Sequence, residues 1–139
     1  MNIVDLMEDA VDLGDVLKSI ASGELAQDQV SYKKCGSAML YLVSPDYGYR
    51  KGEPYNFAMN PNAIEALDCN IRFAATEHIV GKEYRTVGSS RSVGISALGR
   101  TAWEAREKIH QAIRTGLGQP LSLDYRSEIA DETYIKSLI

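Results

Sequence analysis

The sequence predicts an α+β fold, in which a mostly antiparallel sheet carries helices packed on one face. Two observations predict it. Three strand candidates follow one another over residues 70–98, and the connections at Gly81 and Gly88 are too short for crossover helices, so these strands pair antiparallel. A long amphipathic helix then begins at Thr101, and its apolar stripe needs a sheet face to cover.

Length, composition and charge limit the class of protein. The chain has 139 residues, of which 45% are hydrophobic and 24% charged, as is usual for one globular domain with a core of its own. Its formal net charge of −4 argues against a nucleic-acid binder or a binder of anionic membranes, because both need a basic surface. A small phosphorylated ligand needs only a few local donors, so it stays open.

Metal sites, disulfides and membrane segments are not expected. Cys35 and Cys69 have no Cys-x-x-Cys spacing, which favours two reduced thiols. His78 and His110 lack metal-ligand spacing, and each is interpreted as a surface or helix-face residue. Acidic residues stand where a secretory leader would be basic, and no apolar run approaches the ~18 residues of a membrane span. We therefore expect a cytoplasmic location, with neither membrane nor nucleic acid as a partner.

The N-terminal region, residues 1–25, is predicted to be helical. Five apolar residues lie at the spacing of one helix stripe, namely Ile3, Leu6, Met7, Ala10 and Val11. Gly14 interrupts this pattern, and Asp15 can cap a shorter helix that ends at Gly23. Residues 26–130 are predicted to form the main domain, and residues 131–139 a tail without a strong period.

The main domain opens with a strand and a loop. The mostly apolar run over residues 37–44 lies between Gly36 and Pro45 and predicts a buried strand. Residues 45–54 are rich in turn formers and predict a loop. Three tyrosines in or beside this loop could stack on a ligand, although packing against the core is the favoured interpretation. They are Tyr47, Tyr49 and Tyr55.

A short helix, three strands and a long helix are predicted after this loop. Asn60-Pro61 is typical of a helix start, and this helix is expected to end near Asp68. Strands are predicted over residues 70–77, 82–87 and 92–98. The last helix opens with a capping box formed by Thr101 and Glu104, and Gly116 is expected to close it.

A search for catalytic motifs is negative, and no catalytic residue is predicted. The sequence has no phosphate-binding Gly-x-x-x-x-Gly-Lys-Ser/Thr loop, no Gly-x-Gly-x-x-Gly and no His-Glu-x-x-His. One segment does stand out. Residues 86–94 join two strands with small residues, whose backbone N–H groups can approach an anion, and Arg91 adds a forked cation. The alternative is a hairpin turn with an exposed arginine, and spacing alone favours that alternative.

Several segments carry the motifs of one enzyme family. Residues 73–76 are similar to its Phe-His-Ala-Gly-Thr strand, residues 86–94 to its Thr-x-Gly-Gly-Arg-Val-Leu-Gly segment, and residues 95–101 to its Val-Thr-Ala-Leu-Gly-x-Thr. The helix opening at 103–108 is similar to its Glu-Glu-Ala-Arg-Glu-Lys, and residues 125–129 to its closing Tyr-Arg-Arg-Asp-Ile. The chain thus resembles the C-terminal domain of phosphoribosylamine–glycine ligase (glycinamide ribonucleotide synthetase), of the ATP-grasp superfamily.

The resemblance implies a part of a purine-biosynthesis ligase. The family joins glycine to phosphoribosylamine through a glycyl phosphate, using ATP and magnesium. Its ATP lid and magnesium carboxylates lie upstream of the matched region, so no cofactor is expected in this chain and an ATP-grasp partner region would bind both. The C-terminal domain closes the active site and helps to hold the phosphoribosyl substrate.

Four residues are the candidate substrate-binding set. Arg91 is carried over by the resemblance as a phosphate or ribose contact, and Ser89, Ser90 and Arg126 are added beside it. Ser89 and Ser90 stand where the family has paired glycines, which narrows the freedom of the backbone there. Asp and Glu are absent from residues 86–101, so no acid nearby in the sequence neutralises Arg91.

Three functions remain open at this point. The chain is a C-terminal domain or subunit that docks on an ATP-grasp partner, a stand-alone phosphosugar-binding module, or an interaction domain without a ligand. Fold resemblance alone does not decide among them. The apolar stripe of residues 3–11 is expected either to fold back on the sheet or to pair in a homodimer.

Overall fold

The fold is described from a computed structural model. The structure describes residues 3–48, 53–88, 90–118, 121–131 and 133. The chain separates into two compact units, Met1–Lys34 and Cys35–Ile139, and each is described by itself. The predicted α+β class is confirmed, since both sheets of the second unit are antiparallel and helices cover one of them.

The first sheet forms the core of the second unit. Its three strands are β1 (Gly36–Leu42), β6 (Val93–Gly99) and β3 (Cys69–Phe73), in the order β1-β6-β3. The strand β6 lies in the middle and is buried on both faces, which explains why its sequence is apolar or small throughout. In β1 the buried residues alternate with half-buried ones, so the two faces of this strand differ.

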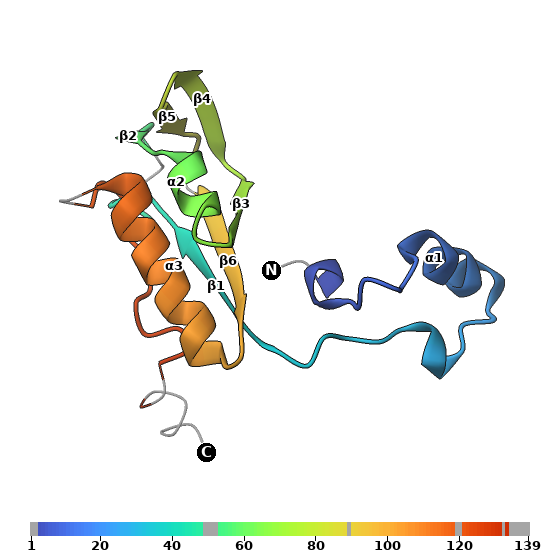
Figure 1. Ribbon diagram of the computed structural model, residues 1–139. Helices are drawn as coiled ribbons and strands as arrows, with labels where there is room; N and C mark the ends of the chain where they lie inside the picture. The colour runs from blue at the N-terminus through green and yellow to red at the C-terminus, as the bar shows by residue number, and fades with distance from the viewer. Residues whose placement is uncertain (1–2, 49–52, 89, 119–120, 132, 134–139) are drawn as a thin grey trace. The chain divides into compact units, whose positions relative to one another are not determined.

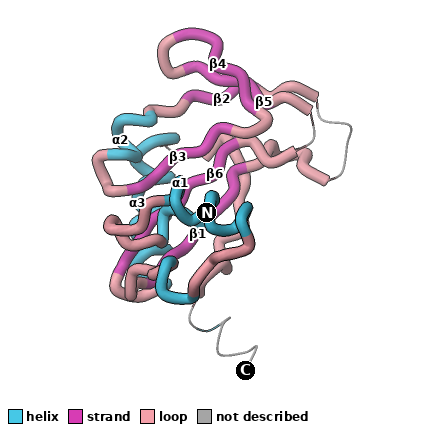
Figure 2. Tube along the Cα trace, turned by 90° about the vertical axis from the view of Figure 1, so that its right-hand side faces the viewer, coloured by secondary structure: helices cyan, strands magenta, loops and turns pink. Residues whose placement is uncertain are grey.

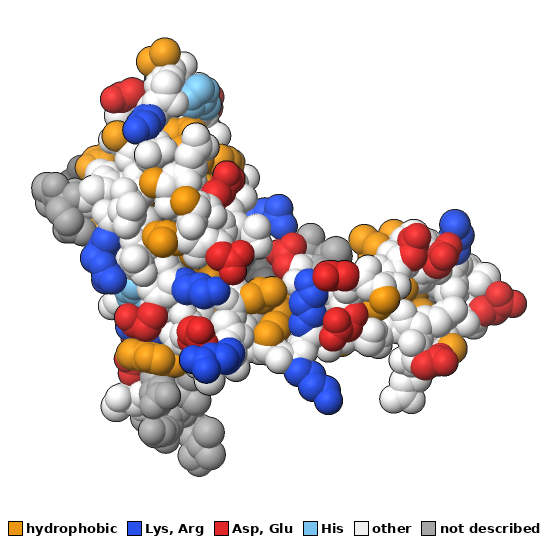
Figure 3. Space-filling model, viewed as in Figure 1, with side chains coloured by type: hydrophobic (Ala, Val, Ile, Leu, Met, Phe, Trp, Pro, Cys, Tyr) orange, Lys and Arg blue, Asp and Glu red, His pale blue; other side chains and the backbone are white. Residues whose placement is uncertain are grey.

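The second sheet is smaller and lies beyond one end of the first (Figure 1, Figure 2). Its strands are β2 (Asn56–Ala58), β5 (Glu83–Thr86) and β4 (Thr76–Val80), in the order β2-β5-β4. At the tip of the β4–β5 hairpin, Gly81 has a φ of 58°, as the predicted turn requires. Hydrophobic side chains show at this outer end in Figure 3, where Ile79 and Val80 are exposed.

The long helix α3 (Ala102–Leu117) lies along β1 and β6 (Figure 1). Its buried stripe meets the apolar face of β1, where Leu40 and Leu42 are fully buried. Of the residues predicted for this stripe, Ala102 is half-buried and the other four are buried, namely Ala105, Ile109, Ala112 and Ile113. His110 and Gly116 are buried on the helix as well. The short helix α2 (Pro61–Glu65) packs against α3 and β3, so both helices cover the first sheet from one face.

The ends of α3 differ from the prediction in detail. Thr101 Oγ1 accepts a hydrogen bond of 3.1 Å from the backbone N–H of Glu104, which confirms half of the capping box. The Glu104 carboxylate instead accepts from the backbone N–H and the Nε of Arg100, at 3.0 and 3.1 Å. The helix runs past Gly116, which is buried against Ile64, and a Cβ at this position would lie 2.3 Å from Ile64 Cγ1. Gly118, with a φ of 75°, follows the last turn.

In the first unit, the predicted helix over residues 3–11 is wrong. Only a 3-10 turn, η1 (Ile3–Leu6), forms there, and Met7 then pairs with Tyr32 in an isolated antiparallel bridge. The helix of this unit is α1 (Leu13–Ser22), which ends at Gly23 as predicted. Its cap is Asp12, whose side chain accepts from the backbone N–H groups of Gly14 and Asp15, so the predicted cap, Asp15, lies inside the first turn. The backbone of residues 6–8 bonds to residues 31–33 instead, and this long-range pairing carries no local signal.

Two strand predictions also need correction. Residues 70–77 were predicted as one strand, but they form β3 and β4 in different sheets. The chain leaves the first sheet at Ala74 and Ala75, whose N–H groups donate to the carbonyls of Ser92 and Arg91. The strand β2 was not predicted, because three residues are too few to show a period. Within the described ranges, no helix combines the length and apolar character that a membrane span needs.

Candidate functional site

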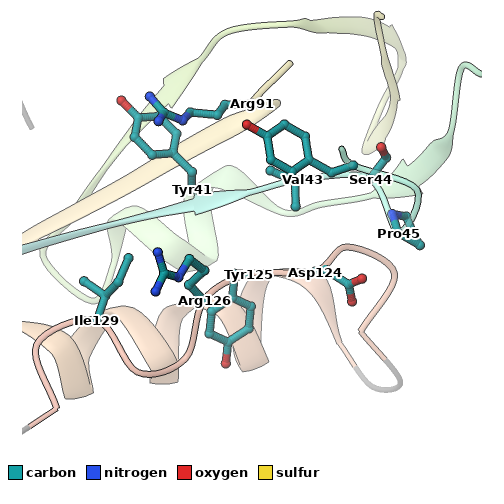
Figure 4. A pocket seen from close by; sticks show the side chains of 10 residues that line it. Tyr41, Val43, Ser44, Pro45, Arg91, Asp124, Tyr125, Arg126 and Ile129 are labelled. Atoms are coloured by element: carbon teal, nitrogen blue, oxygen red, sulfur yellow. The ribbon is translucent and has the colours of Figure 1, made fainter. Parts of the chain in front are cut away.

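A pocket of about 510 Å³ opens beside the end of β1 (Figure 4). Its walls come from β1 and the loop after it, from the β5–β6 connection, and from the C-terminal segment, which we define as residues 121–131. The side chains lie in two rows that face each other across the pocket (Figure 4). One row holds Tyr41, Val43, Ser44, Pro45 and Arg91, and the other holds Asp124, Tyr125, Arg126 and Ile129. Tyr47 also lines the pocket.

The C-terminal segment reaches this place by pairing with β1. The backbones of Val43 and Asp124 exchange two hydrogen bonds of 2.9 Å, one in each direction. Figure 4 shows the side chains of Arg126 and Tyr125 on opposite sides of this segment, with Arg126 directed toward the row that holds Tyr41 and Arg91. The pairing thus brings Arg126 to the end of β1, where Arg91 also lies.

Arg91 is placed by hydrogen bonds of its neighbours. The carbonyl of Arg91 accepts from the N–H of Ala75 at 3.1 Å, and the N–H of Ser92 donates to the carbonyl of Leu42 at 3.0 Å. Gly88 has a φ of 71°, a left-handed conformation that glycine adopts without strain. The backbone at Arg91 is therefore held between β1 and the β3–β4 connection, while its side chain stays exposed.

The side chain of Arg91 rests on an aromatic ring. Its guanidinium carbon lies 4.7 Å from the centroid of the Tyr41 ring, in a cation–π contact (Figure 4). Tyr41 lies opposite Gly94 in the β1–β6 register, and a Cβ on Gly94 would come within 3.2 Å of the Tyr41 ring. The missing side chain of Gly94 leaves the room that the ring occupies, and the ring in turn supports the cation.

Arg126 stands on the facing wall. Its Nε donates a hydrogen bond of 2.7 Å to the carboxylate of Glu128. The backbone N–H of Glu128 and then Arg126 hold the pKa of Glu128 below its usual range, so this carboxylate stays charged at neutral pH. Asp124 adds an exposed acidic group to the same pocket. The pocket thus combines two guanidinium groups, tyrosine rings and a carboxylate.

Tyr125 connects the pocket to helix α3. Its hydroxyl points away from the facing row in Figure 4, and a hydrogen bond of 3.1 Å joins Tyr125 Oη to His110 Nδ1. The two rings meet edge to face, with centroids 5.4 Å apart. Burial lowers the pKa of His110, Arg106 and Arg114 lower it further, and Glu107 opposes them, so the buried imidazole is neutral at pH 7.

The structure brings some of the candidate residues together and not others. Arg91 and Arg126 line one pocket, although they are far apart in the sequence. Ser90 is exposed and does not line it, and Ser89 lies outside the described residues. Arg85, a further cation close to Arg91 in the sequence, does not line the pocket and forms an ion pair with Glu77 on the second sheet. The segment 86–94 is not a hairpin turn, because β5 and β6 belong to different sheets.

The sequence did not single out several residues of the pocket. Tyr41 lies in a segment predicted as a buried strand, so the sequence did not indicate that its ring would line a pocket. Asp124 belongs to no motif that would have marked it as a pocket residue. His110, interpreted as a surface or helix-face residue, is buried, with 7% of its surface exposed. Among the three loop tyrosines, Tyr47 lines the pocket, Tyr55 does not, and Tyr49 lies outside the described residues. The pairing of Val43 with Asp124 brings the C-terminal segment beside β1, and no local sequence pattern predicts that pairing.

The pocket is suited to binding and does not by itself suggest a reaction. Guanidinium groups recognise phosphate or carboxylate, and tyrosine rings and a carboxylate can contact a sugar. In the part of the chain that the structure describes, no three or more His, Cys, Asp and Glu side chains gather as metal ligands would. A scan against models of known protein families finds no match to this chain, and a search among curated proteins finds none either.

Proposed function

We propose that this chain binds the phosphoribosyl substrate of an ATP-dependent phosphoribosylamine–glycine ligase, as the C-terminal domain or subunit of that enzyme. One observation supports the proposal most. Arg91 and Arg126, the two cations that the sequence singled out, line the same pocket from opposite walls. Both arginines lie beside tyrosine rings in this pocket, so charged and aromatic groups for a phosphorylated sugar are present together.

The position of the resembling segments also supports the proposal. Residues 86–94 form the connection that carries Arg91, and residues 125–129 form the wall that carries Arg126. Two of the segments that resemble the ligase thus contribute residues to the pocket, whereas β1, the loop after it and Asp124 supply the rest of its lining. In the proposed enzyme an ATP-grasp partner region supplies the ATP and magnesium sites, and this chain contributes the contacts to the phosphate and the ribose.

A titration with ribose 5-phosphate tests the binding. Backbone amide signals are followed by NMR while the ligand is added to the full chain. We expect binding in the high micromolar to millimolar range, or roughly 4 to 6 kcal/mol, with the shifts centred on residues 88–94 and 124–128. Arg91→Ala and Arg126→Ala should each weaken the affinity at least about fivefold, since each loses a charge-assisted bond.

Two controls sharpen the result. Arg114→Gln removes an exposed arginine of α3 outside the pocket, and its affinity should match the wild type. Arg91→Lys keeps the positive charge but cannot form the paired hydrogen bonds of a guanidinium. Its affinity for ribose 5-phosphate should lie between those of the wild type and Arg91→Ala. Shifts that map elsewhere, or that survive unchanged in both arginine variants, would show that the site is not this pocket.

A second candidate function is a protein-interaction module. It is favoured by the apolar end of the β4–β5 hairpin, where Ile79 and Val80 have 49% and 67% of their surfaces exposed. Absence of any shift with ribose 5-phosphate at high concentration, in a folded sample, would favour this candidate over the ligase domain.

A further inference from the structure

The wall that carries Arg126 is a narrow segment, and its attachments decide where the arginine lies. Val43 holds it upstream through the two backbone hydrogen bonds to Asp124. Arg106 holds it downstream, since its Nη2 donates to the carbonyl of Ser127 at 2.8 Å. Between these two points, the Tyr125 ring packs against the core and meets the His110 ring edge to face, and its hydroxyl forms the hydrogen bond with His110.

His110 is an unusual residue for its position. It lies on the buried stripe of α3 beside Ile109 and Ile113, where an aliphatic residue would pack without a polar atom. Its Nε2 is buried and has no hydrogen-bond partner among the described residues. Burial of an unpaired polar nitrogen costs stability, so packing alone does not explain the imidazole. Its Nδ1 explains it, because the hydrogen bond to Tyr125 Oη adds a directional contact to the apolar packing of the tyrosine ring.

We propose that His110 is a positioning residue of the pocket, which fixes Tyr125 through the Oη–Nδ1 hydrogen bond and so directs the next residue, Arg126, at the ligand. This inference rests on the proposed function, because it assumes that the pocket binds a phosphorylated sugar. Neither His110 nor the Tyr125 hydroxyl has to touch the ligand. The effect passes through the backbone, since Arg126 follows Tyr125 directly and its side chain lies on the opposite side of the segment (Figure 4).

A double-mutant cycle on ligand affinity tests the inference. The variants are Tyr125→Phe, which removes only the hydroxyl, His110→Leu, and the two combined. Ribose 5-phosphate is titrated into each full-length chain by NMR, and urea unfolding is measured in parallel. We expect each single variant to weaken the affinity roughly threefold to tenfold, as for one lost hydrogen bond, and the double variant to be no weaker than His110→Leu.

Two further variants separate positioning from a general loss of structure. His110→Asn keeps a hydrogen-bonding group near the place of Nδ1 and should restore part of the affinity that His110→Leu loses. Tyr55→Phe removes a tyrosine hydroxyl outside the pocket and should bind as the wild type does. If His110→Leu does not fold, Tyr125→Phe still carries the test, because its ring and its packing are retained.

The outcomes are distinct. Unchanged affinity in Tyr125→Phe, or effects of the two single variants that simply add, would overturn the positioning role while the proposed function stands. Loss of stability without loss of affinity in the folded fraction would overturn it too, because His110 would then be structural only. No binding by the wild type would overturn the proposed function and the inference together.

Discussion

Gly94 shows how one small residue shapes the candidate site. Its Cβ, if present, would lie 2.6 Å from Met39 Cε and 3.2 Å from Tyr41 Cε1, so the tyrosine ring fills the space that the glycine leaves. The Arg91 guanidinium then rests on that ring. From the sequence we singled out Arg91 by its type and its neighbours, but not Tyr41, because strand pairing brings the ring there and no local pattern records it.

Cys69 is predicted to be an inert thiol. It is buried, and burial raises its pKa to about 11, although Lys108 opposes the shift. The thiolate is the reactive form, so very little of it is present at pH 7.5. In a Cys35→Ser variant, which leaves Cys69 alone, a disulfide reagent should label the native protein far more slowly than the urea-unfolded protein. Equal rates would show that the thiol is open to solvent.

His110 is predicted to make stability depend on pH. The groups around the buried ring are Arg106, Glu107 and Arg114 on α3 and Tyr125 on the C-terminal segment, and the net effect lowers the pKa of His110 below its usual 6.5. Between the folded and unfolded values the unfolded chain binds more protons, so stability is fully present above about 6.5 and declines as the pH falls below it.

The measurement compares urea unfolding at pH 7.5 and 5.5 for the wild type and for His110→Asn. The wild type should lose more stability over this interval than the variant, which has no imidazole to protonate. His78→Gln is the matched control, because His78 is exposed, and it should keep the slope of the wild type. A slope that is the same in all three proteins would contradict the prediction.

At the scale of elements, α3 was the best predicted part of the chain. Its stripe, its start and its place on the sheet follow from the spacing of apolar residues and from Thr101. Its last turn was misjudged, because Gly116 is needed for the close approach of Ile64 and not for a stop. The helix predicted over residues 3–11 did not form, because long-range contacts again decide the local structure. Helical spacing was present, but the backbone there pairs with residues 31–33.

Thr101→Ala is predicted to weaken α3. The variant loses the hydroxyl that accepts from the Glu104 N–H, and loss of such a cap costs about 1 kcal/mol. Thr115→Ala is the matched control on the same helix, since Thr115 is exposed near the other end and caps nothing there. Urea unfolding should show a lower free energy for Thr101→Ala alone. Equal losses in both variants would mean that the cap contributes nothing measurable.

At the scale of the whole molecule, the sequence predicted the fold class but not the division into two sheets. Antiparallel pairing was predicted correctly across Gly81, where β4 pairs with β5, but wrongly across Gly88, because β5 and β6 lie in different sheets. The exit of the chain at Ala74 and Ala75 depends on hydrogen bonds to Arg91 and Ser92. The candidate site shows the same limit. Two arginines were named from the sequence, but the wall that unites them exists only after Asp124 pairs with Val43.

The chain is predicted not to catalyse the ligase reaction alone. The sequence has no phosphate-binding loop, and the family's ATP lid and magnesium carboxylates lie upstream of the region that it resembles. Purified protein, free of host ligase, should neither hydrolyse ATP nor form glycinamide ribonucleotide above a blank without protein. Activity should appear when an ATP-grasp ligase body that lacks its own C-terminal domain is added. Turnover by the chain alone would refute the prediction.

The central position of β6 has a consequence for how the chain is made. Gly36 pairs with Gly99 across the sheet, so β1 has no partner until most of the second unit has been synthesised. At ordinary elongation rates, the wait between the end of β1 and the arrival of β6 is roughly 3 to 10 s. Distant pairings of this kind also place refolding in the range of milliseconds to seconds. Leu40 and Leu42, which are fully buried in the folded unit, therefore lack their partner strand for the whole of that interval.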